Sequence, residues 1–75
     1  MRGPDRSAVY DYVREHPDTD VRRIVADLYP DASPYDASYL RGRVAHHLTE
    51  LRKHGRITGE HADGSRNMKI WRAVE

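Results

Sequence analysis

The spacing of the apolar residues changes at Gly55, and this change limits the folds open to the chain. Before Gly55 the apolar residues recur every three or four positions, which is the period of an amphipathic helix. After it they alternate over residues 56–61 and 67–74, which is the period of a strand. Asp63-Gly64 lies between these segments and is a hairpin-turn signal. We therefore expect an α+β fold in which helices are followed by a C-terminal β-hairpin.

Three helices are expected before the hairpin. They span about residues 5–15, 20–29 and 34–54. Pro17 and Pro30 follow the first two helices, because the residue before a proline is disfavoured in the helical conformation. Ser33 is an N-cap for the third helix, and Gly55 is suited to its C-terminal cap. Since a lone hairpin is only marginally stable in water, the two strands are expected to pack on the helices with Trp71 as their anchor.

The length and composition indicate one folded domain over residues 1–75. The chain has no cysteine, which excludes a disulfide scaffold, a thiolate metal site and a cysteine nucleophile. No apolar stretch approaches the length of a membrane span, and no signal-peptide core is visible at the N-terminus. We therefore expect a cytoplasmic protein with no membrane partner.

Positive charge is concentrated in the second half of the chain. Residues 1–36 carry five basic and eight acidic side chains, whereas residues 37–75 carry eight basic and four acidic ones. In the third helix, the side opposite the apolar stripe around Leu40 holds short, polar and cationic residues, with Glu50 as its only acid. A helix of this kind fits the major groove of B-DNA, where such side chains contact phosphates and base edges.

The candidate DNA-binding residues lie on this outward side of the third helix and on the hairpin. The set is Ser38, Arg41, Gly42, Arg43, His46, Thr49, Arg52, Lys53, Arg66 and Lys69. Ser38, His46 and Thr49 are the candidates for base edges, and the lysines and the arginines of the helix are candidates for phosphates. Gly42 would allow a close approach of the helix. Arg66 would place a cation from the hairpin tip on the backbone or in the minor groove.

One block of the sequence carries a family resemblance. Residues 47–57, His-Leu-Thr-Glu-Leu-Arg-Lys-His-Gly-Arg-Ile, are similar to the HLxxLxxxGxI pattern of the winged helix-turn-helix regulators of prokaryotes and their viruses. Residues 68–74 resemble the returning strand of the wing in that family, and the likeness covers about residues 7–74. The segment from Tyr29 to Ser38 departs from the family, because it is longer than the usual turn between the second and third helices.

This resemblance implies a three-helix winged helix-turn-helix domain whose third helix enters the major groove. It further implies sequence-specific binding to double-stranded DNA and a role in transcription regulation, as a repressor rather than an activator. The chain lacks the additional helices through which larger regulators of the class pair. If the protein forms a homodimer, the two copies must pair through the first helix or through an exposed patch.

The sequence offers no catalytic or metal-binding motif. There is no nucleophile elbow, phosphate-binding glycine loop or paired-carboxylate spacing, so we expect no enzyme, no cofactor and no small-molecule substrate. His46 and His47 are adjacent on a helix and point about 100° apart. His47 and His54 lie on one side but are separated by roughly 10 Å along the axis. Neither pair can hold one metal ion.

Two other uses of the same fold stay open. A winged helix can serve as a protein–protein interaction module, and the acidic first half could bind a basic partner. Single-stranded nucleic acid would require exposed aromatic side chains on the basic face. Tyr35 and Tyr39 at the edge of that face are the aromatic residues available there.

Overall fold

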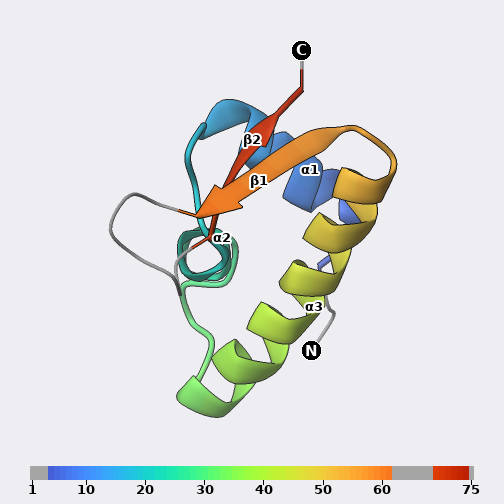
Figure 1. Ribbon diagram of the computed structural model, residues 1–75. Helices are drawn as coiled ribbons and strands as arrows, with labels where there is room; N and C mark the ends of the chain where they lie inside the picture. Colours follow the sequence, from blue (N-terminus) through green and yellow to red (C-terminus); the bar gives the residue numbers. More distant parts are fainter. Residues whose placement is uncertain (1–3, 62–68, 75) are drawn as a thin grey trace.

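The protein consists of three helices followed by a two-stranded antiparallel sheet (Figure 1). The computed structural model describes residues 4–61 and 69–74. Its elements are α1 (Arg6–Glu15), α2 (Val21–Leu28), α3 (Pro34–Lys53), β1 (Ile57–His61) and β2 (Lys69–Ala73). This layout confirms the α+β class and is consistent with a winged helix that ends in a C-terminal hairpin. Each helix begins and ends within one residue of the bounds expected from the sequence.

Local signals explain where the helices begin and end. The side chains of Asp5 and Asp20 accept hydrogen bonds from backbone N–H groups in the first turns of α1 and α2, at 2.7 Å and 2.9 Å. The Ser33 hydroxyl accepts one from the Asp36 N–H at 3.1 Å and caps α3. Gly55 follows α3 with a φ of 73°, a left-handed conformation that glycine adopts without the cost that a side chain would impose.

The apolar stripes of the helices meet in one core beneath the sheet. The buried side chains are Val9, Tyr12, Val13, Ile24, Val25, Leu40, Val44, Leu48, Leu51, Ile57 and Trp71. All five elements contribute to this core. Because α3 supplies four of these residues along its length, its opposite side is left facing outward.

Trp71 anchors the hairpin to the helices, as the sequence analysis expected. Its side chain is 5% exposed, and its cross-strand partner is Gly59. A Cβ atom at Gly59 would lie 2.6 Å from the Trp71 ring, so only glycine leaves room for the indole. The backbone N–H of Trp71 also donates to the Thr19 carbonyl oxygen at 2.8 Å, and its carbonyl oxygen accepts from the Asp18 N–H at 3.1 Å. The loop between α1 and α2 thus pairs with the outer edge of β2, a contact that the sequence did not reveal.

A hydrogen bond between side chains fastens α1 to α2. The hydroxyl of Tyr12 on α1 donates to a carboxylate oxygen of Asp27 on α2. Burial raises the pKa of Tyr12 above its ordinary value, and the hydrogen bond to Asp27 raises that pKa further. Tyr12 is therefore a neutral core residue at physiological pH, and its hydroxyl is satisfied inside the fold.

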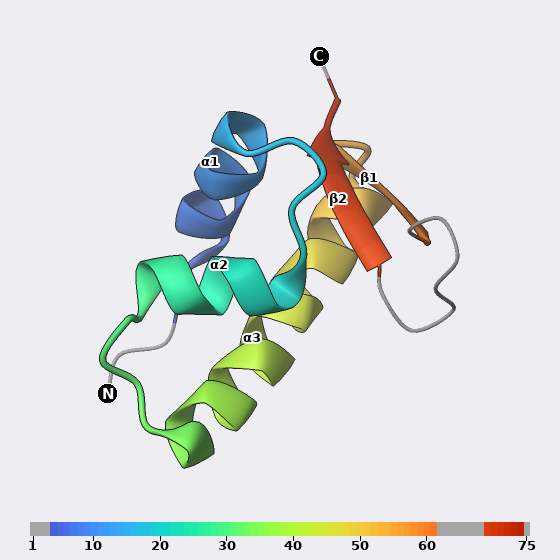
Figure 2. The same cartoon turned by 90° about the vertical axis from the view of Figure 1, so that its left-hand side faces the viewer.

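The arrangement of the elements leaves α3 and the hairpin free on one side. α1 packs against β2, whereas the ends of β1 and β2 at residues 61 and 69 project away from α1 (Figure 2). Within residues 4–61 and 69–74, no helix combines the length and the apolar character needed to cross a bilayer.

Candidate nucleic-acid interface

The outward side of α3 is exposed over its whole length. This holds for each candidate on the helix: Ser38, Arg41, Gly42, Arg43, His46, Thr49, Arg52 and Lys53. Ser38, Gly42, His46, Thr49 and Lys53 lie opposite the buried residues of α3, while Arg41 and Arg52 lie at one edge of that side and Arg43 at the other. The structure therefore leaves all eight candidates of α3 exposed, with five of them on one side.

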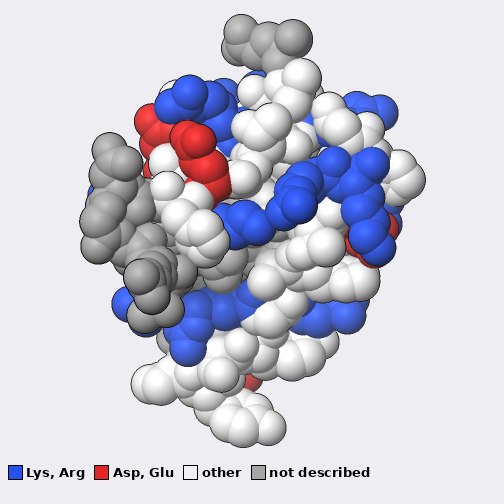
Figure 3. All heavy atoms as spheres, viewed as in Figure 1, with Lys and Arg blue, Asp and Glu red and all other residues white. Residues whose placement is uncertain are grey.

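The cations of α3 form no ion pair within the described residues, and Glu50 is the one acid on their side of the helix. Among the described residues the structure contains one ion pair, between Arg72 and Asp18, and neither residue belongs to α3. In the space-filling view, Lys and Arg atoms form two bands across the face that carries α3, with few Asp or Glu atoms between them (Figure 3). Unpaired cations on a convex surface attract polyanions and release counterions when they bind phosphates.

The middle of this face is shallow. Gly42 has open space where a Cβ atom would stand, and its neighbours one turn away are Ser38, Ala45 and His46. A helix with small side chains at its centre can bring its backbone close to a groove floor while longer cations reach the two edges. Gly42 costs α3 about 1 kcal/mol relative to alanine, and its contact with a groove stays a prediction.

The side chain of Thr49 has a defined hydrogen-bonding state. Its hydroxyl donates to the Ala45 carbonyl oxygen within α3, at 3.0 Å. Because the hydroxyl proton is used within the helix, Thr49 presents its oxygen lone pairs and its methyl group outward. Such a side chain accepts a hydrogen bond from the amino group of adenine or cytosine, or packs on the methyl group of thymine.

His46 and His47 have different environments, as their positions on the helix predicted. His46 is exposed on the outward side, whereas His47 is half-buried against the start of α1. The Nε2 atom of His47 lies 2.9 Å from the Pro4 carbonyl oxygen. His47 is therefore a structural contact between α3 and the N-terminal segment. Within the described parts of the chain, no group of three or more His, Cys, Asp and Glu side chains is arranged to hold a metal ion.

The remaining two candidates, Arg66 and Lys69, were expected on the hairpin. Lys69 begins β2, and its Nζ atom lies 4.9 Å from the centre of the Trp71 ring. This cation–π contact ties the lysine side chain to the anchor of the sheet, at the end of the strands that projects away from α1. Arg66 lies outside the described residues, so its predicted role stays a prediction.

Two exposed tyrosines extend the outward side toward the N-terminus of α3. Tyr35 is 85% exposed and Tyr39 is 56% exposed. The sequence analysis placed both at the edge of the basic face, and the structure shows that the core covers neither ring. Each presents a hydroxyl and an aromatic surface to a phosphate, a base or a partner protein.

The comparisons with known proteins give no indication of function. No family model matches the chain, and neither the curated proteins nor the solved structures contain a significant match.

Proposed function

We propose that the protein binds double-stranded DNA through the outward side of α3. The helix lies in the major groove, and the hairpin lies on the adjacent backbone or minor groove. Sequence-specific binding of this kind would serve transcription regulation in the cytoplasm, at the nucleoid, as a repressor that occupies a promoter. The resemblance of residues 47–57 to winged helix-turn-helix regulators supports the same reading.

The observation that carries the proposal is the exposed side of α3. It joins four cations, Arg41, Arg43, Arg52 and Lys53, to a shallow centre at Gly42, and no described carboxylate pairs with those cations. A helix side that only faces water needs neither the unpaired cations nor the central glycine, because charges of both signs are enough to keep a surface solvated. Major-groove binding uses both, since cations hold the phosphates at the groove edges while the helix approaches the bases.

An amide NMR titration of the full chain with a mixed-sequence duplex tests the proposal. We expect chemical-shift changes concentrated in residues 37–54 and in the hairpin, and we expect them to shrink as salt is raised, because phosphate contacts release counterions. A single-stranded oligonucleotide of the same sequence is the parallel sample. The absence of shifts at low salt would show that the protein does not bind duplex DNA, and a protein partner would then be the ligand to test. Larger shifts at Tyr35 and Tyr39 with the single strand than with the duplex would reassign the ligand.

Base reading is testable separately from affinity. Replacing both His46 and Thr49 by alanine should reduce discrimination between DNA sequences more than it reduces total affinity, because both side chains face outward at the centre of α3. Each lost base contact costs about 1–3 kcal/mol of discrimination. Competition between an enriched binding site and random duplex measures this effect. Equal losses on both DNAs would show that the pair does not read bases.

A further inference from the structure

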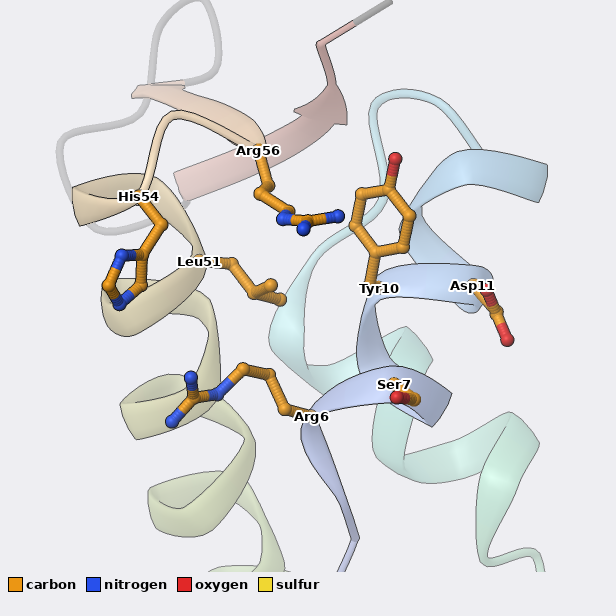
Figure 4. Close-up of a pocket in the computed structure, with 7 residues that line it drawn as sticks. All are labelled: Arg6, Ser7, Tyr10, Asp11, Leu51, His54 and Arg56. Atoms are coloured by element: carbon orange, nitrogen blue, oxygen red, sulfur yellow. The ribbon is translucent and has the colours of Figure 1, made fainter.

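A second surface feature lies away from the outward side of α3. A hollow of about 660 Å³ opens between α1, the last turn of α3 and the residue that leads into β1 (Figure 4). Its lining includes the side chains of Arg6, Ser7, Tyr10, Leu51, His54 and Arg56. Hollows of about 300–1,000 Å³ are the size that binds small molecules in proteins.

Positive charge dominates this hollow. Arg6 comes from α1 and Arg56 from the segment before β1, and neither forms an ion pair within residues 4–61 and 69–74. Figure 4 shows the Arg56 side chain entering from above, the Arg6 side chain running along the lower edge, and His54 on the α3 side. Asp11 is the one acidic residue of the lining, and its carboxylate points away from both guanidinium groups in that view.

Arg56 is held in place by contacts on several sides. Its guanidinium carbon lies 5.9 Å from the centre of the Tyr10 ring. Its backbone N–H donates to the Leu51 carbonyl oxygen at 3.0 Å, and its carbonyl oxygen accepts from the Val74 N–H at 2.9 Å. Leu51 is 3% exposed and closes the inner side of the hollow with apolar surface. The guanidinium therefore stands over an apolar floor, oriented by an aromatic ring.

We propose that this hollow binds the phosphate group of a small anionic molecule. The Arg56 guanidinium would be its main donor, because a planar guanidinium matches two phosphate oxygens at once. The Arg6 guanidinium lies at the lower edge, on the α3 side, and would add positive charge at the rim (Figure 4). The Ser7 hydroxyl and the His54 ring supply further donors at the rim. The lining is net positive, since two arginines stand against the single carboxylate of Asp11.

The ligand is a free anion rather than the backbone of the duplex bound by α3. Leu51 is two residues from Thr49, so the two side chains point roughly 160° apart around the helix axis. A duplex on the outward side of α3 therefore faces away from the hollow. The anion site goes beyond the proposed DNA function and does not depend on it.

The test is an amide NMR titration of the full chain with inorganic phosphate and with adenosine 5′-monophosphate, at constant ionic strength. We expect saturable shifts at Arg6, Ser7, His54 and Arg56 with both probes. Arg56→Gln should weaken binding about 10-fold, because it removes a charge-assisted contact with the anion. The variant keeps the backbone hydrogen bonds of this exposed position. Arg6→Gln provides an independent second variant, which should weaken binding to a smaller extent because it removes positive charge at the rim.

Arg14→Gln is the matched control, since it removes an exposed arginine from the same helix as Arg6 but outside the hollow. It should leave the affinity unchanged. The proposal is overturned if Arg14→Gln weakens binding as much as Arg56→Gln, or if millimolar phosphate produces no saturable shift. Duplex DNA is the last arm of the experiment. If duplex shifts the same four residues and Arg56→Gln removes those shifts, the hollow contacts the DNA backbone, and the assignment to a small molecule is wrong.

Discussion

Replacing Arg41 and Arg43 together by glutamine is expected to weaken binding to every duplex on the order of 50-fold at 0.1 M salt. The two arginines flank Gly42 on the exposed side of α3, and no described carboxylate pairs with them. If each holds one phosphate, their loss lowers the dependence of log affinity on log salt by about two units, since each phosphate contact contributes about 0.9. Binding isotherms at several salt concentrations measure both quantities.

Arg14→Gln with Arg23→Gln is the matched control for that experiment. Both residues are exposed, one on α1 and one on α2, and the pair removes the same total charge. Glutamine keeps a helix propensity close to that of arginine, so neither double variant should unfold the domain. The control should change affinity only through the weak long-range field. An equal loss in the two double variants would mean that net charge, and not the surface of α3, holds the DNA.

Trp71→Ala is expected to lower the stability of the domain strongly. Removing a buried tryptophan side chain costs about 3–5 kcal/mol. A domain of 75 residues has a total free energy of unfolding of roughly 4–11 kcal/mol. The melting temperature should therefore fall by about 15–30 °C. Thermal unfolding followed by far-UV circular dichroism measures the shift, because the method does not require the tryptophan.

Tyr35→Ala is the control, because it removes an aromatic ring that is 85% exposed. It should change the free energy of unfolding by less than about 0.5 kcal/mol, as surface substitutions usually do. Similar melting temperatures for the two variants would contradict the anchoring role of Trp71. The same experiment also tests whether β2 is the element that fastens the hairpin, since Trp71 joins β2 both to the core and to Thr19.

The sequence was sufficient for the helices because their signals are local. The caps at Asp5, Asp20 and Ser33 act within three residues of the backbone N–H groups that they satisfy. A glycine directly after a helix predicts a left-handed C-terminal cap, because few other residues tolerate a positive φ, and Gly55 adopts that conformation. The outward side of α3 followed from the helical period alone, which is why the candidate residues on that helix are all exposed in the structure.

Contacts between distant residues were beyond sequence reasoning. Nothing in the local pattern pairs Thr19 with Trp71, or places His47 against Pro4, because these contacts depend on how the elements pack. The hollow at Arg6 and Arg56 is a further case: fifty positions separate the two arginines, and each looks like an ordinary surface residue in the sequence.

The sequence by itself therefore determined the order of the elements, their ends and the side of α3 that faces outward, since a periodic pattern and a cap need no distant partner. The tertiary structure decided which surfaces lie together. It directed the ends of the strands at residues 61 and 69 away from α1, left the cations of α3 without an ion pair among the described residues, and formed a cationic hollow where α1 meets the start of β1. These features depend on packing across the core, which brings residues together without regard to their separation along the chain.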